Sequence, residues 1–197
     1  MVRCAGSSSP AIERETGVLD MFSRRRTMAR INLFGGLAVL ASYAYCLTAY
    51  SAQVGDFWGG VPDGLRSLYT VNMGLAAAGY LAFTYFLLYR LKPEASDAGG
   101  FGLGAFNALY VLILLPSALW MPLTFAMLES PSDALWWGIR LTLAAVGIAS
   151  LGLLVGLVAV GPRSPSVAHK LAVAGSLAFC CQTAILDALV WPAYFPA

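Results

Sequence analysis

Charged residues are scarce in this chain. Asp, Glu, Lys and Arg make up 11% of its 197 residues, whereas hydrophobic residues make up 59%. A soluble domain of this size carries about a quarter charged residues and fewer than half apolar ones. With so little charge and a mean hydropathy of +0.72, the chain lacks the polar surface that a globule in water requires. The composition therefore excludes an ordinary soluble domain and predicts an integral membrane protein.

Residue types that build metal and redox sites are also few. His169, expected at a solvated interface, is the only histidine, which excludes a bis-histidine haem and an ordinary zinc site. Cys180 and Cys181 are adjacent and Cys46 lies in an apolar run, so we expect no disulfide scaffold. The glycines of residues 99–104 lack the preceding strand and following lysine of a phosphate loop. We expect no cofactor, no metal and no nucleic acid as ligand, and no catalytic group is indicated.

Five apolar segments are each long enough to cross a bilayer, which takes about 20 helical residues. They cover residues 31–52, 65–91, 101–128, 134–160 and 167–191. Short links rich in glycine and proline separate them, and Ser132 and Ser166 stand where helix starts are expected. The predicted fold class is all-α, an integral membrane bundle of five transmembrane helices over residues 31–197.

The first 30 residues are polar and have no apolar periodicity. We expect residues 1–30 to form a mostly disordered basic leader, with a short interfacial helix over residues 18–26 as the ordered part. Met21 and Met28 are alternative start sites, so the first 20 to 27 residues need not belong to the mature protein.

Basic residues predict the orientation. If the chain alternates through five helices, ten of the 12 basic residues fall on the side of the leader: Arg3, Arg14, Arg24, Arg25, Arg26, Arg30, Arg90, Lys92, Arg163 and Lys170. Arg66 and Arg140 fall on the other side. Because cytoplasmic loops carry the excess of Lys and Arg, we expect the N-terminus inside and the C-terminus outside.

Small residues predict where helices meet, because close backbone approach drives helix association in lipid. The second segment has Gly74, Ala78 and Ala82 on one face, and the fourth has Ala145, Ala149, Gly152 and Gly156. In the third segment, Pro116 and Pro122 should bend or break the helix. They free the carbonyls of Leu112 and Ala118, which then need other donors.

Asp187 is the one acidic residue inside a hydrophobic segment. A charge at such a place is costly, so it usually has a partner and often a function. Arg140 lies at similar depth on the fourth segment, and a guanidinium can meet a carboxylate through two parallel hydrogen bonds. We therefore expect an ion pair between Arg140 and Asp187.

Four other polar or aromatic residues fall at about the depth of this pair. Counting along the helices places six candidate ligand-binding residues in one outer-leaflet layer: Asp187, Arg140, Asn72, Gln182, Trp120 and Tyr69. Gln182 precedes Asp187 by five residues, so on an α-helix their side chains would be offset around the axis. The ion pair has two interpretations, a link that joins two helices or the edge of a polar pocket.

These observations favour a non-enzymatic multi-pass membrane protein. It would act as a structural or assembly subunit, or bind a small amphipathic ligand or lipid in an outer-leaflet polar pocket. The alternatives are a small secondary carrier with Asp187 as its proton or cation site and a lipid-modifying membrane enzyme. The expected partners are membrane lipids and either further copies of the chain or a larger membrane complex.

Overall fold

The computed structural model describes residues 10–91, 101–161 and 166–195, which form helices joined by short links. The long elements are α1 (Pro10–Ala49), α2 (Asp63–Tyr85), α3 (Leu103–Glu129), α4 (Asp133–Ala159) and α5 (Val167–Cys180). α2 continues as the π-helix η3 (Phe86–Arg90), and α5 continues as the π-helix η6 (Cys181–Val190) and then α6 (Trp191–Tyr194). Two 3-10 turns, η1 (Ser51–Gln53) and η2 (Asp56–Trp58), lie between α1 and α2.

Five of these helical stretches are long and apolar enough to cross a membrane: Leu19–Ala49, Asp63–Arg90, Leu103–Glu129, Asp133–Ala159 and Val167–Tyr194. The expected all-helical bundle of five candidate spans is confirmed, and it fits a multi-pass membrane protein. No strand occurs in the ranges that the structure covers.

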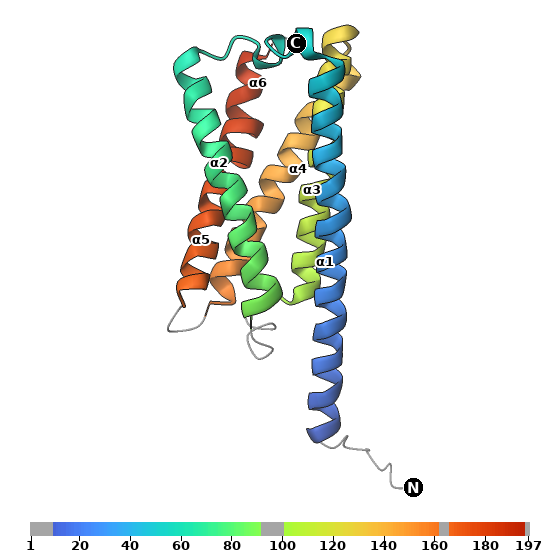
Figure 1. Cartoon of the computed structure of the whole chain (residues 1–197), viewed down its shortest axis with the longest axis vertical. Helices are drawn as coiled ribbons and strands as arrows, with labels where there is room; N and C mark the ends of the chain where they lie inside the picture. The colour runs from blue at the N-terminus through green and yellow to red at the C-terminus, as the bar shows by residue number, and fades with distance from the viewer. Residues whose placement is uncertain (1–9, 92–100, 162–165, 196–197) are drawn as a thin grey trace, which may run out of the picture.

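The helices pack as a series of neighbours. α1 lies along α3, α2 lies along α5, and α4 packs against both α3 and the α5–η6 helix (Figure 1). The start of α1 and the end of α6 lie at opposite ends of the bundle (Figure 1). We call the end next to Arg24, Arg90 and Lys170 the basic end, and the end that holds η1, η2 and α6 the aromatic end. Arg3, Lys92 and Arg163, also predicted at the basic end, lie outside the described residues.

The first helix begins at Pro10, whereas the expected span began at residue 31. The structure has residues 10–30 as a continuation of α1, a longer helix than the one expected over residues 18–26, and the first turns of α1 extend beyond the rest of the bundle (Figure 1). The physical reason is that a helix already nucleated by its apolar part is extended at little cost, one hydrogen bond per residue. Asp20 and Arg24 add an ion pair at 2.7 Å across one turn, and Met28 is fully buried.

Side-chain hydroxyls form hydrogen bonds with backbone groups at two helix N-termini and near one of the prolines of α3. Ser132 and Ser166 accept hydrogen bonds from the backbone of the third residue after each, as their predicted roles as helix starts require. α3 runs unbroken through Pro116 and Pro122, so the predicted break does not occur. The Ala118 carbonyl, which Pro122 cannot use, accepts a 2.7 Å hydrogen bond from the Ser42 hydroxyl of α1. This contact ties α1 to α3.

The closest helix contact joins α2 and α5 at a pair of glycines. A Cβ on Gly79 would lie 2.3 Å from the backbone oxygen of Gly175, so neither position has room for a side chain. The face predicted for α2 is wrong, because Gly74 has no atom near its added Cβ and Ala78 is exposed. The buried face of α2 instead repeats in steps of three and four residues through Tyr69, Asn72, Ala76, Gly79 and Phe83. This spacing is that of a left-handed helix pair.

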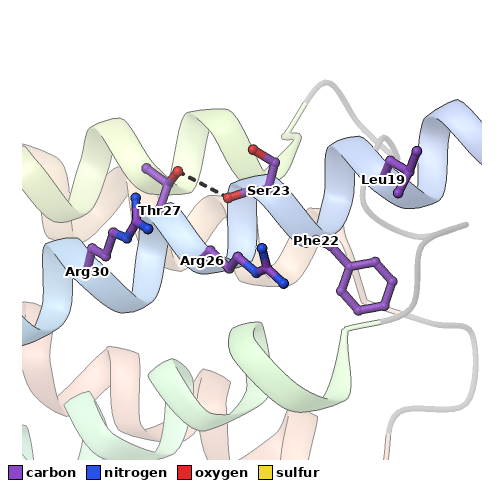
Figure 2. A pocket seen from close by; sticks show the side chains of 6 residues that line it. All are labelled: Leu19, Phe22, Ser23, Arg26, Thr27 and Arg30. Atoms are coloured by element: carbon purple, nitrogen blue, oxygen red, sulfur yellow. Dashed lines mark hydrogen bonds between the residues drawn. The ribbon is translucent and has the colours of Figure 1, made fainter.

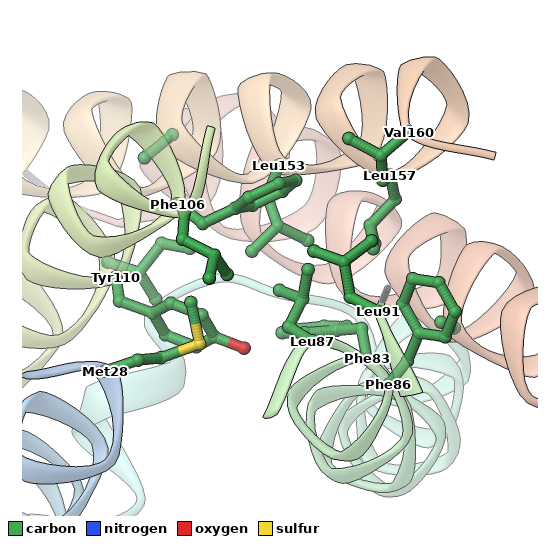
Figure 3. Close-up of a cluster of buried hydrophobic side chains, with 14 of the residues drawn as sticks. Met28, Phe83, Phe86, Leu87, Leu91, Phe106, Tyr110, Leu153, Leu157 and Val160 are labelled. Atoms are coloured by element: carbon green, nitrogen blue, oxygen red, sulfur yellow. The ribbon is translucent and has the colours of Figure 1, made fainter. Parts of the chain in front are cut away.

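Three glycines of α4 lie where this helix comes close to its neighbours. Added Cβ atoms would meet Leu109 at Gly152, Phe106 at Gly156, and Thr183 and Ala184 at Gly147. α4 therefore approaches α3 through two glycines and η6 through a third. Near the basic end a cluster of large side chains fills the space between the helices (Figure 3), including Met28, Phe83, Phe86, Leu87, Phe106, Tyr110, Leu153 and Leu157.

The glycine contact predicts a selective effect of one methyl group. Gly79→Ala should destabilise the protein by about 1–3 kcal/mol, because the new carbon meets backbone that cannot rotate away. Gly74→Ala is the matched control on the same helix, and its open surroundings predict unchanged or slightly higher stability. Unfolding of both variants in mixed detergent micelles measures the difference. Equal stability of the two variants would contradict the contact.

Candidate functional site

Asp187 lies on η6, and the geometry of this π-helix decides its hydrogen bonding. In an α-helix, residues five apart are offset by about 140° around the axis. In a π-helix the backbone bonds run from i to i+5, so residues five apart lie on nearly the same face. The Gln182 amide nitrogen accordingly donates a 2.8 Å hydrogen bond to the Asp187 carboxylate. The offset predicted for these two side chains is wrong because the helix is π rather than α here.

This bond continues across to α2. The Asn72 amide nitrogen donates to the Gln182 side-chain oxygen at 3.1 Å and to the Ala178 carbonyl at 3.2 Å. Asn72 and Gln182 are both buried, and Asp187 is half-buried. We call Asp187, Gln182 and Asn72 the acid network. It uses both ends of the Gln182 amide, so that no polar atom of this side chain is left without a partner.

Tyr69 joins the same region through the backbone. Its buried hydroxyl donates a 2.6 Å hydrogen bond to the Leu186 carbonyl, next to Asp187 in the chain. Tyr69 therefore links α2 to η6 beside the acid network.

Aromatic rings cover the adjoining space at the aromatic end. The Trp120 indole N–H donates to the Tyr43 hydroxyl, and the Trp191 indole N–H donates to the Phe57 carbonyl at 3.1 Å. The Trp120 ring lies 5.0 Å from that of Phe57 and 5.7 Å from that of Trp191, between centroids. We call Tyr43, Phe57, Trp120 and Trp191 the aromatic cluster. It joins α1, η2, α3 and α6, and Trp191 lies one helical turn beyond Asp187.

Arg140 does not belong to this arrangement. In the part of the chain that the structure describes, no basic nitrogen lies within 4.0 Å of the Asp187 carboxylate, so the predicted ion pair is absent. The Arg140 guanidinium instead lies 5.6 Å from the Trp136 ring centre and 5.8 Å from that of Trp137. The reason is azimuthal: Ile139 faces the bundle interior, so Arg140, about 100° further around α4, is exposed.

Four of the six predicted residues are thus brought to one place by hydrogen bonds: Asp187, Gln182, Asn72 and Tyr69. Trp120 lies in the aromatic cluster beside them, and Arg140 lies elsewhere. Tyr43 and Phe57 were not predicted. Tyr43 lies on α1 and Phe57 lies in the turn that follows it, and the packing of α1 and η2 against α3 places both here.

The chemistry open to this site is that of a carboxylate with spare acceptor capacity. An ionised carboxylate can accept about four hydrogen bonds, and the described residues contribute one, from Gln182. No group of three or more His, Cys, Asp or Glu side chains within the described ranges is placed to hold a metal ion. Cys180 and Thr183 continue a polar edge toward α4, where the Thr183 hydroxyl donates to the Ser150 hydroxyl at 2.8 Å.

His169 differs from its expected place at a solvated interface. It is buried, and its Nε2 lies 2.9 Å from the Leu157 carbonyl, with the Phe86 ring against the imidazole. His169 lies in the first turn of α5, and this turn packs under the last turn of α4. Its role in the structure is to hold these two helices together at the basic end.

Comparison with known proteins identifies no relative. No protein-family model, no curated protein and no solved structure matches this chain.

A double-mutant cycle tests the acid network. Gln182→Leu removes the donor to Asp187 and the acceptor for Asn72, and it should destabilise the protein by about 1–3 kcal/mol. Replacing Asp187 as well, in Gln182→Leu/Asp187→Leu, should cost less than the sum of the single variants by about 0.5–3 kcal/mol, because no carboxylate is then left without a donor. Unfolding free energies in mixed micelles give this coupling.

Arg140 provides the control for the same cycle. Because it does not touch Asp187, Arg140→Gln and Asp187→Leu should be additive within about 0.5 kcal/mol. A coupling between these two residues as large as that between Gln182 and Asp187 would show that the ion pair forms after all.

Proposed function

We propose that this protein is a non-enzymatic multi-pass membrane protein that binds a small amphipathic amine, whose cationic group pairs with Asp187. The observation that carries the proposal is the carboxylate itself. It lies half-buried in a helix that is long and apolar enough to cross a membrane, and its hydrogen-bond partner is a neutral amide. Within the described residues no basic nitrogen lies within 4.0 Å of it.

The energetics of burial favour a partner from outside the chain. Removing a carboxylate from water costs several kcal/mol, and a single hydrogen bond to a charged group, which contributes about 1.5–3 kcal/mol, does not fully offset this. Ionisable residues inside a membrane usually mark a site for a ligand, an ion or a proton. An ammonium group would stabilise the buried carboxylate of Asp187, since it brings both a positive charge and several N–H donors.

The aromatic cluster supports an amine rather than a bare ion. A cation gains about 0.5–2 kcal/mol over the face of an aromatic ring, and tryptophan is the best of these faces. Trp120, on α3, and Trp191, on α6, bring two such rings to this end of the bundle at right angles to each other, and Trp191 follows Asp187 by one helical turn. Their apolar edges, together with Phe57, suit the hydrocarbon part of an amphipathic molecule.

The location of the site sets the side from which a ligand enters. We place the basic end of the bundle inside and the aromatic end outside, on the excess of arginine at the basic end. Asp187 then lies in the outer leaflet, about one turn below Trp191. An amphipathic ligand would reach it from that leaflet, with its polar group toward the interface.

Binding of dodecylamine tests the proposal. A saturating ligand stabilises the folded protein by about 2.7 kcal/mol at a hundredfold excess over its Kd. Dodecylamine should therefore raise the melting temperature of the protein in lipid nanodiscs by several degrees, whereas uncharged dodecanol should not. Asp187→Asn, which keeps an acceptor for Gln182 but loses the charge, should abolish the shift.

Asp63→Asn is the matched control, because Asp63 is an exposed carboxylate at the same end of the bundle. This variant should respond to dodecylamine as the unmodified protein does. An equal shift in Asp187→Asn would sink the proposal. If dodecylamine has no effect, but Asp187→Asn abolishes proton or cation flux into liposomes, the carrier function replaces it. Dissociation of a native complex by the same substitution would identify a structural or assembly subunit.

A further inference from the structure

A second site lies at the opposite end of the bundle, on α1. Two cavities follow one face of this helix. The first, of about 490 Å³, is lined among the described residues by Leu19, Phe22, Ser23, Arg26, Thr27 and Arg30 (Figure 2). The second, of about 380 Å³, continues from Arg30 between α1 and α3. Neither is lined by Asp187 or any other residue of the acid network.

The arginines that line this face of α1 end at Arg30, and the residues of α1 that line the second cavity beyond it are apolar. The lining residues of α1 recur every three or four positions, through Arg26, Arg30, Phe34 and Ala38, so both cavities lie along one helical face. The second cavity has an apolar wall from α3, made by Val111, Leu114, Leu115 and Ala118. Arg30 lines both cavities, so the cavity that contains the two arginines adjoins the apolar groove between α1 and α3.

The two arginines of this face are available to a ligand. Arg24 is paired with Asp20 at 2.7 Å, and Arg25 donates to the Leu91 carbonyl. Arg26 and Arg30 are exposed, and neither has an ion pair or a side-chain hydrogen bond to any other described residue. The hydroxyls of Ser23 and Thr27 lie on the same face (Figure 2). Two guanidinium groups one turn apart, with hydroxyls beside them, match the oxygens of a phosphate.

We propose that this face binds an anionic phospholipid of the leaflet at the basic end. The phosphate lies between Arg26 and Arg30, and one acyl chain lies in the groove between α1 and α3. The length of the groove fits this occupant. From Arg30 to Ala38 the helix rises about 12 Å, against about 15 Å for half of the hydrocarbon core. Basic sites beside membrane helices on the cytoplasmic side are typical of anionic lipid recognition.

The test counts lipids bound to the intact chain in mild detergent by native mass spectrometry. Dioleoylphosphatidylglycerol should bind and dioleoylphosphatidylcholine should bind at least tenfold more weakly. Arg26→Gln/Arg30→Gln should weaken phosphatidylglycerol binding roughly 30-fold, since each arginine near an anionic headgroup contributes about a factor of five. Arg90→Gln, at the same end but outside both cavities, should bind as the unmodified protein does.

A second variant tests the groove without changing charge. Ala38→Trp fills the apolar cavity, and Ala38 is exposed, so folding should be unaffected. It should weaken phosphatidylglycerol binding severalfold, while glycerophosphoglycerol, the headgroup without acyl chains, should bind neither protein measurably. Equal binding of the two lipids, or undiminished binding by either Arg26→Gln/Arg30→Gln or Ala38→Trp, would overturn the proposal. Tight binding of glycerophosphoglycerol would overturn it as well, in favour of a soluble phosphate ligand.

Discussion

The contact between Gly79 and Gly175 sets the register on which the site depends. α2 and α5 run antiparallel, and the two glycines allow their backbones to touch. Seven residues away on each helix, toward the aromatic end, Asn72 meets Gln182. One turn further on, the Tyr69 hydroxyl reaches the Leu186 carbonyl. A larger residue at either glycine would separate the helices, and side chains as short as asparagine would no longer span the gap.

The π-helix η6 then brings Gln182 and Asp187 together, which the register of α2 and α5 alone does not do. Asn72 can reach Gln182 across the helix pair, but Gln182 reaches Asp187 only because η6 places residues five apart on one face. The result is a carboxylate held by an amide that is itself held by a second amide. Asn72, Gln182 and Asp187 each have a polar neighbour in this network, while Asp187 retains acceptor capacity and has no basic nitrogen of a described residue within 4.0 Å. This imbalance is the physical basis for a ligand at that position.

The two proposed sites differ in charge and in construction. The acid network lies between helices and draws on η6 and α2, whereas the basic face belongs to α1, which packs along α3 alone for most of its length. α1 also leaves many large apolar residues exposed, among them Phe34, Leu37 and Leu40. In a bilayer these contact lipid, so a lipid held by Arg26 and Arg30 would extend an interaction that the helix makes along its whole apolar length.

The sequence by itself determined an all-helical bundle with five candidate spans, because the length of its apolar runs and its scarcity of charge are properties of the residues and their order. It located four of the five candidate spans to within three residues at each end, the caps at Ser132 and Ser166, and Asp187 as the residue to explain. It could not determine azimuth. Depth along a helix follows from counting, but which side of each helix faces its neighbours depends on packing. For that reason Arg140 and Gly74 were assigned to faces that they do not occupy, and Tyr43 was missed. The start of α1 was misplaced because polarity alone does not end a helix. Only the tertiary structure decided that α5 becomes a π-helix, and with it the partner of Asp187, since that change of helix type has no signature in residue spacing.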